Sequence, residues 1–411
     1  MQASSKLKKR KETTHRQNKK SLQTTDTMSK NYRIIISGGG TGGHIFPALS
    51  IADAIRSKYP DAEILFIGAE NRMEMQRVPE AGYPIIGLPV MGFDRSNPLR
   101  NIKVLWKLFI SRRRAKKIIK EFAPQVAVGV GGYASGPTLN IAAKMEIPTL
   151  IQEQNSYAGV TNKLLAKKAK MICVAYEGME RFFPHEKIKL TGNPVRNTLL
   201  SKQGSREECA RIMNLDATKK TILLVGGSLG ARTMNESMLH SLDTIKANPD
   251  IQFVWQTGKY YYKEITERIE KAGKPANLTI TDFVSDMASA LGAANLVISR
   301  AGAGSISEFA LLGKAVILVP SPNVAEDHQT KNAMALVEKG AAILVSDSEA
   351  KEKLVATAIA TVQNDDTLAT LSKNISTMAK PKAAEEIAEE VILLAEAYAE
   401  KETRRKNENL K

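Results

Sequence analysis

Short apolar runs alternate with longer stretches of helical periodicity along the first half of the chain. The β-branched run Arg33–Ser37 leads into a glycine-rich loop, Gly38–His44, and a helix-periodic stretch follows from Pro47 to Lys58. Four more apolar runs have the length of strands: Ile64–Gly68, Val126–Val130, Thr149–Gln152 and Met171–Val174. Strands that alternate with helices are typical of a parallel sheet with helices on both faces. The pattern therefore predicts a doubly wound α/β domain.

The second half of the chain repeats this unit. Thr221–Val225 reads as a strand, Gly226–Arg232 as a glycine loop, and a helical pattern continues to about Ile245. Further strands are expected at Gln252–Gln256, Leu278–Thr281, Leu296–Ser299, Ala315–Val319 and Ala342–Val345. The predicted fold class is α/β, with two Rossmann-like doubly wound domains that face each other across a cleft.

The boundary between the two domains is expected near Leu190–Arg196, where a short strand breaks into a turn. This places one domain at 28–195 and a second domain at 196–381. A helix is predicted at 382–400, and its packing partner cannot be derived from the pattern. The polar segments 1–27 and 401–411 contain no aromatic residue, and we expect both to be disordered.

The net charge of +16 on 411 residues is concentrated in three segments. Residues 1–27 carry eight Lys and Arg against two acids, residues 100–120 carry nine with no acid, and residues 401–411 carry five against two. A nucleic-acid-binding protein usually combines a basic surface with aromatic stacking platforms, but aromatics make up only 5% of this chain. We therefore expect no nucleic-acid partner.

The basic segment Asn101–Lys120 has the pattern of an amphipathic helix. Helices with apolar and cationic faces lie on anionic membrane surfaces, although an ordinary half-buried helix gives a similar pattern. No apolar run reaches the roughly 18 to 20 residues that span a bilayer. The predicted membrane-contacting residues are Ile102, Leu105, Trp106, Phe109, Arg112, Arg113 and Arg114.

The first glycine loop, Gly38–His44, lets backbone N–H groups approach a phosphate at the start of a helix. A tight strand-to-helix turn without a ligand is the alternative. His44 closes the loop, where the positive end of the helix dipole favours the neutral imidazole, so His44 can act as a general base. A capping or packing role for His44 stays open.

The segment Ser299–Glu308 follows a strand and opens a second phosphate-binding helix. Glu308 lies one turn further on and can accept both hydroxyls of a ribose, or it can simply complement the helix dipole. There is no Asp-x-Asp pair and no cluster with metal-ligand spacing, so we expect no metal and no cofactor. Arg196 is then the candidate cation for a diphosphate, and a salt bridge at the junction is its alternative role.

Six motifs in this order resemble the MurG family, the N-acetylglucosaminyltransferases of bacterial peptidoglycan synthesis. The resemblance runs from about Arg33 to Ala333. It is carried by Gly38–His44, Gly131–Pro137, Glu153–Asn155, Gly192–Arg196, Gly226–Arg232 and Ala301–Glu308, with Gln329 downstream. The chain departs from the family at Leu229 and His328, where glutamine is common in the family.

The resemblance implies a two-domain glycosyltransferase fold of the GT-B type and assigns the site by position. The donor, UDP-N-acetylglucosamine, would place its uridine against the backbone of Val284 and Met287, and its ribose on Glu308. The rest of the donor site would comprise Ala303, Gly304, Ser305, Ile306, Ser307, Arg196, Ser228, Gln329, Thr41, Gly42, Gly43 and Asn155. The acceptor would be contacted by Gly39, Gly40, Tyr133 and Ser135.

The resemblance also implies the reaction and its location. The acceptor is undecaprenyl-linked muramyl-pentapeptide, whose muramyl 4-hydroxyl attacks the anomeric carbon with inversion. His44 is the expected base and Glu153 is the alternative. The enzyme would bind anionic lipids peripherally at the cytoplasmic face of the plasma membrane. Two other classes stay open: a UDP-N-acetylglucosamine 2-epimerase, and a non-enzymatic basic protein that binds lipid or nucleic acid.

Overall fold

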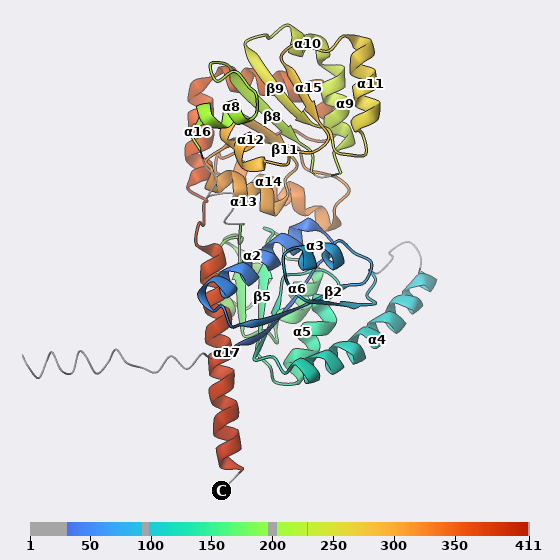
Figure 1. The fold of residues 1–411 in the computed structure, drawn as a ribbon, viewed down its shortest axis with the longest axis vertical. Coiled ribbons are helices and arrows are strands. Elements are labelled where there is room, and N and C mark those ends of the chain that lie inside the picture. Colours follow the sequence, from blue (N-terminus) through green and yellow to red (C-terminus); the bar gives the residue numbers. More distant parts are fainter. Residues whose placement is uncertain (1–30, 93–97, 196–203, 228, 410–411) are drawn as a thin grey trace, which may run out of the picture.

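A computed structural model describes residues 31–92, 98–195, 204–227 and 229–409. The first half forms a seven-stranded parallel sheet in the order β3-β2-β1-β4-β5-β6-β7 (Figure 1). Its strands are β1 (Arg33–Ser37), β2 (Glu63–Ala69), β3 (Ile85–Leu88), β4 (Val126–Gly129), β5 (Thr149–Glu153), β6 (Met171–Val174) and β7 (Ile188–Leu190). The helices are α2 (Gly42–Lys58), α3 (Glu74–Glu80), α4 (Pro98–Phe122), α5 (Ser135–Lys144) and α6 (Val160–Ala166), and short 3₁₀ turns lie at Met179–Arg181 and His185–Lys187.

The second half forms a six-stranded parallel sheet in the order β10-β9-β8-β11-β12-β13. Its strands are β8 (Lys220–Val225), β9 (Ile251–Gln256), β10 (Leu278–Thr281), β11 (Leu296–Ser299), β12 (Ala315–Leu318) and β13 (Ile343–Leu344). The surrounding helices are α8 (Arg206–Ile212), α9 (Arg232–His240), α10 (Leu242–Lys246), α11 (Tyr262–Ala272), α12 (Met287–Ala293), α13 (Ala303–Leu311), α14 (His328–Val337), α15 (Ala350–Gln363) and α16 (Asp365–Ser376), with a 3₁₀ turn at Ala325–Asp327.

Both faces of the first sheet are covered. Ile34 and Ile36 of β1 are fully buried in one apolar cluster, and Ile35 is fully buried in the cluster on the opposite face. A central strand between two helical layers has no solvated face, which explains its continuous apolar run. The predicted doubly wound α/β class is confirmed for both halves of the chain.

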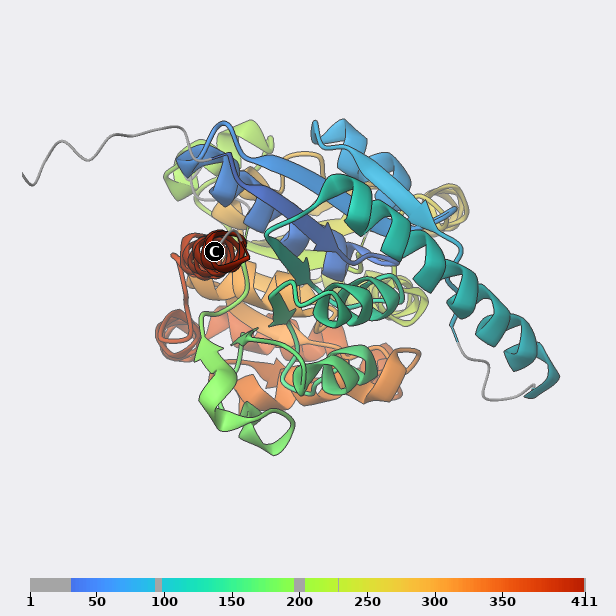
Figure 2. The ribbon, with the colours of Figure 1, turned by 90° about the horizontal axis from the view of Figure 1, so that it is seen from below.

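The last helix, α17 (Ala383–Glu408), returns to the first sheet (Figures 1 and 2). Ile387, Val391 and Ala395 are buried in the same cluster as Ile34. The ion pair between Lys189 and Glu390, 2.7 Å long, adds a polar contact beside this cluster. The sequence pattern predicted this helix but not its partner.

The C-terminal segment differs from the prediction. Residues 401–408, which we expected to be disordered, continue α17 as far as Glu408. Lys401 and Arg405 both pair with Glu146, at 3.2 and 2.8 Å, so the end of the helix is tethered to the first half of the chain. The predicted basic extension, residues 1–27, lies outside the described residues.

Candidate active site

The loop that follows β1 is shaped by glycine and by a buried carboxylate. Gly39 and Gly40 have φ angles of +135° and +95°, which disfavour any residue with a Cβ atom. The Glu74 carboxylate lies beneath the loop, fully buried, and accepts the N–H of Gly40 at 2.9 Å. A second bond, from the Ala69 N–H at 2.9 Å, holds the same carboxylate. Because Glu74 engages this N–H, the Gly40 amide is not directed at a ligand.

His44 lies in the first turn of α2, against the loop that follows β4. A Cβ atom on Gly131 would lie 2.9 Å from the His44 Nε2, so only glycine leaves room for the ring. Burial, the larger cause, and the electrostatic effect of His328 together lower the pKa of His44 to about 4. The Glu74 carboxylate and a backbone hydrogen bond at Gly39 oppose both effects. His44 is therefore neutral near pH 7 and able to accept a proton.

Glu153, the last residue of β5, is buried and saturated with hydrogen bonds. Its Oε1 accepts the backbone N–H of Asn155 at 3.1 Å and that residue's side-chain amide at 3.3 Å. Its Oε2 accepts from the Gly159 N–H at 3.0 Å and the Asn162 Nδ2 at 2.8 Å. Burial raises the pKa of Glu153, and these bonds oppose the shift. The carboxylate thus shapes the loop between β5 and α6.

Asn332 of α14 joins the two halves of the chain. It is fully buried, and its Oδ1 accepts the Ser156 N–H at 2.9 Å and the Ser156 hydroxyl at 3.1 Å. Its Nδ2 donates to the Asn155 Oδ1 at 3.1 Å and to the Ala301 carbonyl at 3.3 Å. The predicted residue Asn155 is therefore connected through Asn332 to the loop that begins α13.

A second polar bridge lies beside the first. The Asn193 Nδ2 donates to the Ser307 Oγ at 3.1 Å and to the Gln154 carbonyl at 3.0 Å. The Gln152 Nε2 in turn donates to the Asn193 Oδ1 at 3.0 Å. The predicted residue Ser307 thus contacts the first half of the chain through its side chain.

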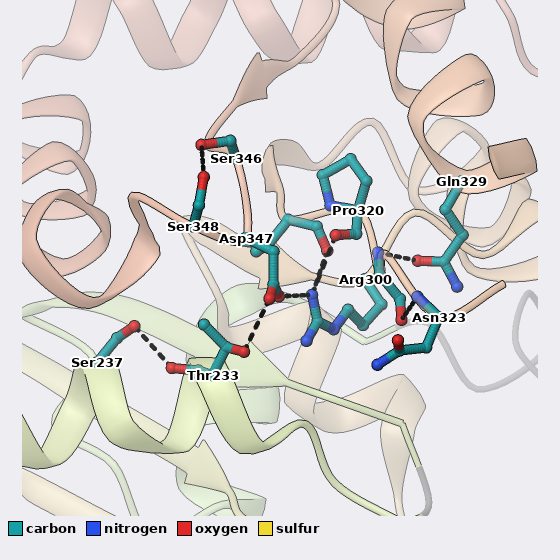
Figure 3. Close-up of polar contacts among 11 residues, drawn as sticks. Thr233, Ser237, Arg300, Pro320, Asn323, Gln329, Ser346, Asp347 and Ser348 are labelled. Carbon is teal, nitrogen blue, oxygen red and sulfur yellow. Dashed lines mark hydrogen bonds and ion pairs between the residues drawn. The ribbon is translucent and has the colours of Figure 1, made fainter.

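A cavity of about 480 Å³ lies where β8, β11 and β12 end. Gly226, Gly302 and Ser305 line it, as does Gln329, whose Oε1 accepts the Ser321 N–H at 2.9 Å (Figure 3). The N-terminus of α13 opens beside it, where unpaired N–H groups favour an anion. The cavity has the size and the polar donors that a sugar nucleotide requires.

Other predicted residues differ in how far their side chains are exposed. Tyr133 is half exposed, whereas Ser135 is fully buried and its hydroxyl contacts the Ser37 and Gly131 carbonyls at 2.6 and 2.7 Å. The side chain of Ser135 therefore holds the loop, which leaves only its backbone for an acceptor. The side chains of Val284 and Ile306 pack in the apolar core, and the Ala303 methyl group is also buried, so these three residues too can offer only backbone. The predicted residues Arg196 and Ser228 lie outside the described residues.

Nowhere in 31–92, 98–195, 204–227 and 229–409 do three His, Cys, Asp or Glu side chains gather as a metal site requires. None of the helices in those ranges is both long and apolar enough to cross a bilayer.

Comparison with known proteins identifies the family. The glycosyltransferase family 28 N-terminal domain matches residues 34–174, and the C-terminal domain of the same family matches residues 221–387. A Bacteroides thetaiotaomicron protein is 65% identical over 90% of this chain and 100% of its own length. It is named UDP-N-acetylglucosamine--N-acetylmuramyl-(pentapeptide) pyrophosphoryl-undecaprenol N-acetylglucosamine transferase. The chain belongs to this transferase family.

Other members and neighbours agree with the family assignment. A Porphyromonas gingivalis transferase of the same name is 53% identical over 89% of this chain and 96% of its own. The crystal structure of Acinetobacter baumannii MurG superposes with a TM-score of 0.70 at 28% identity, covering 88% of this chain and 99% of that chain. The UDP-GlcNAc 2-epimerase of Neisseria meningitidis reaches a TM-score of 0.60 at 14% identity, with coverage of 87% and 98%, and shares the fold alone. The predicted family and GT-B fold are confirmed.

Several site residues were not found from the sequence. Glu74 lies in no recognisable motif, and only its place beneath the glycine loop shows its role. Asn332 follows Gln329 by three residues on one helix, a spacing that places both on the same face and that could have singled it out. Asn193 lies inside the Gly192–Arg196 motif, which marked the segment but not the bond that it makes.

Proposed function

We infer that this chain transfers N-acetylglucosamine from UDP-N-acetylglucosamine to the muramyl 4-hydroxyl of undecaprenyl-diphosphate-muramyl-pentapeptide, the step from lipid I to lipid II in peptidoglycan synthesis. The observation that carries this conclusion is the 65% identity that extends over the whole length of the Bacteroides thetaiotaomicron transferase. The chain is accordingly a UDP-sugar-dependent hexosyltransferase. The competing epimerase function rests on fold alone, at 14% identity.

The donor is proposed to occupy the cavity at the ends of β8, β11 and β12. The N–H groups at Ala303–Ser305 would meet the diphosphate, and this placement is supported by the open N-terminus of α13 at the cavity wall. Glu308 would accept the ribose hydroxyls, and the backbone of Val284 and Met287 would meet the uracil. Arg196 and Ser228 are proposed to complete the diphosphate site, with Gln329 beside the sugar.

The acceptor is proposed to meet the donor at the loop after β1. Thr41, Gly42 and Gly43 begin α2, whose positive end suits the acceptor diphosphate. Gly39, Gly40, Tyr133 and Ser135 would flank the acceptor, and Asn155 would reach toward the sugar. The first domain would in this way present a lipid-linked substrate to the donor domain.

His44 is proposed as the general base. As the muramyl O4 bonds to the anomeric carbon, its proton passes to His44 and the bond from that carbon to the UDP oxygen breaks on the opposite face, which inverts the configuration. The lowered pKa of His44 supports this role, because the imidazole is unprotonated at neutral pH. Glu153 is the alternative base, but its four hydrogen bonds commit both of its oxygens to the loop.

Attachment to the anionic cytoplasmic leaflet is proposed to occur through α4. Ile102, Leu105, Trp106 and Phe109 are each more than half exposed, and the last two stack at 6.0 Å. Figures 1 and 2 both show the N-terminal end of α4 projecting from the molecule. Apolar side chains on a projecting helix that carries Arg112, Arg113 and Arg114 support peripheral binding.

One assay separates the candidate functions. The protein is incubated with radiolabelled UDP-N-acetylglucosamine, with and without the lipid-linked muramyl acceptor. We expect a labelled lipid-linked disaccharide only with acceptor, and the reaction should persist in EDTA. Epimerised sugar formed without acceptor would identify a 2-epimerase, and unchanged donor in both reactions would leave a non-enzymatic binding protein.

A further inference from the structure

A carboxylate lies in the wall of the cavity that is proposed to take a diphosphate. Asp347 follows β13, and its Oδ1 is 2.5 Å from the Arg300 Nη1. The two side chains are only 20% and 15% exposed, so water screens the pair weakly. Both residues line the cavity, where an unpaired carboxylate would repel the donor.

The pair belongs to a larger network of polar contacts (Figure 3). The Arg300 Nη1 also donates to the Val319 carbonyl at 3.1 Å and to the Pro320 carbonyl at 3.2 Å. On the other side, the Thr233 hydroxyl donates to the Asp347 Oδ2 at 2.9 Å. The two oxygens of Asp347 therefore hold two different segments.

The residues of this network come from segments that follow four neighbouring strands. Arg300 follows β11, Val319 and Pro320 follow β12, Asp347 follows β13, and Thr233 lies in the first turn of α9 after β8. The four strands are adjacent in the sheet, in the order β8-β11-β12-β13. Arg300 also directly precedes Ala301 and Gly302, which lead into α13. The ion pair between Arg300 and Asp347 and the hydrogen bond from Thr233 to Asp347 thus connect the loop before α13 to the first turn of α9, and all three residues line the cavity.

We propose that Asp347 is a positioning residue for the donor diphosphate: it holds Arg300 and Thr233 together and so sets the spacing of the two phosphate-binding loops. This inference rests on the proposed donor site. Asp347 acts through Arg300 and does not touch the donor. Arg300 in turn cancels the negative charge that Asp347 brings into the cavity.

The test compares Asp347→Ala, which removes both contacts, with Asp347→Asn, which keeps an acceptor for Arg300 and a polar partner for Thr233. We expect Asp347→Ala to weaken UDP binding in calorimetry by about tenfold, the scale of one hydrogen bond to a charged group. Uridine, which lacks the diphosphate, should bind within about twofold of the parent. Asp347→Asn should bind UDP as tightly as the parent or more tightly, because the geometry is kept and the positive charge of Arg300 is no longer neutralised.

Kinetics and a matched control complete the experiment. Asp347→Ala should raise the donor KM about tenfold and leave kcat at saturating donor within about twofold. Glu349→Ala is the control, because Glu349 lies in the same loop but pairs with Lys353 on the exposed surface. If Asp347→Ala does not fold, Thr233→Val carries the test, with an expected loss of UDP affinity of about threefold.

The outcomes are distinct. Unchanged UDP affinity in Asp347→Ala overturns the inference, and so does an equal loss in Asp347→Asn or an equal loss for uridine. If Thr233→Val has to replace Asp347→Ala, unchanged affinity there overturns it as well. Glu308→Ala tests the donor site separately: if that change leaves UDP affinity intact, the proposed donor site itself is wrong. A loss with Glu308→Ala but none with Asp347→Ala overturns the positioning role alone.

Discussion

Three ionisable side chains of the first domain have different environments. Glu74 is buried beneath the glycine loop after β1 and is held by two backbone N–H groups. Glu153 is buried at the end of β5 and is held by four donors. His44 has a lowered pKa, a hydrogen bond with the backbone of Gly39 and a long contact, 3.4 Å, between its Nδ1 and the Thr41 hydroxyl. Of the three, His44 is the group best able to exchange a proton with a substrate.

Replacing His44 by alanine should reduce kcat by about 10²- to 10⁴-fold, the usual contribution of a general base. Donor affinity in calorimetry should not change, because the donor cavity lies at the ends of the strands of the other sheet. An unchanged kcat with a raised acceptor KM would make His44 a binding residue instead.

The pH profile should reflect the lowered pKa of His44. An ordinary histidine has a pKa of 6.5, but the pKa of His44 is about 4. His44 therefore stays unprotonated at pH 6.5, and kcat/KM should fall only as the pH drops toward 4. His328→Asn removes a positive neighbour that disfavours protonation, so the pKa of His44 and the acid limb should both move upward. If kcat/KM of the parent instead fell around pH 6.5, and this fall were absent in His44→Ala, the expectation would be wrong.

Glu153→Gln should lower the free energy of unfolding by about 1–3 kcal/mol, because an amide would place a donor against the donors at Asn155, Gly159 or Asn162. Urea denaturation measures this change, and His44→Ala is the matched comparison, with a smaller expected loss. If Glu153→Gln abolished turnover at full stability, Glu153 would be the base.

Among the elements, α4 has an uneven surface. Val104, Ala115 and Ile119 are buried against the rest of the molecule, whereas the N-terminal half of the helix exposes large apolar side chains. Arg114 pairs with Glu70 of the loop after β2, and the Arg113 guanidinium lies 5.8 Å from the Phe109 ring centroid. The helix α4 therefore has two apolar surfaces: one is buried against the rest of the molecule, and the other is exposed to solvent.

Reversing Arg112 and Arg113 to Glu, in a chain that starts at Met28, should reduce sedimentation with phosphatidylglycerol vesicles by at least about 30-fold. Each basic residue near an anionic surface contributes about 1 kcal/mol, and reversal also adds repulsion. The matched control reverses Lys271 and Lys274, which are exposed at the end of α11 in the other domain. Activity on a short-chain soluble acceptor should persist in both variants.

Vesicle binding that survives the reversal at Arg112 and Arg113, or that is insensitive to salt, would make α4 an ordinary surface helix. Trp106→Ser combined with Phe109→Ser tests the apolar part independently, since burial of these side chains in lipid needs no charge.

At the scale of the whole molecule, two segments that lie near the junction of the two domains contact each other, one at Gly192 and one at Lys380. A Cβ atom on Gly192, whose φ is +87°, would lie 2.3 Å from the Cβ of Lys380, just before α17. Asn332 adds buried hydrogen bonds between the domains some distance along the chain from either segment. These buried hydrogen bonds therefore help to set the relative position of the donor and acceptor sites.

Asn332→Ala should separate the domains, because it removes the partners of Ser156, Asn155 and the Ala301 carbonyl at once. We expect a larger radius of gyration in small-angle scattering and a fall in kcat/KM of about tenfold or more. Asn364→Ala, which removes the cap of α16 far from the junction, is the control. An unchanged radius together with unchanged kinetics would show that Asn332 does not hold the domains.

The sequence by itself determined the two parallel sheets, the positions of the glycine loops and the family, because apolar periodicity and glycine spacing are local properties of the chain. Only the tertiary structure decided which distant groups meet. The placement of α17 on the first sheet, the helical state of residues 401–408 and the burial of Ser135 depend on partners far away in sequence. So do the bonds of Asn332, whose partner Ser156 lies 176 residues away. The local sequence pattern does not predict such contacts, because each of them depends on how both domains fold and pack.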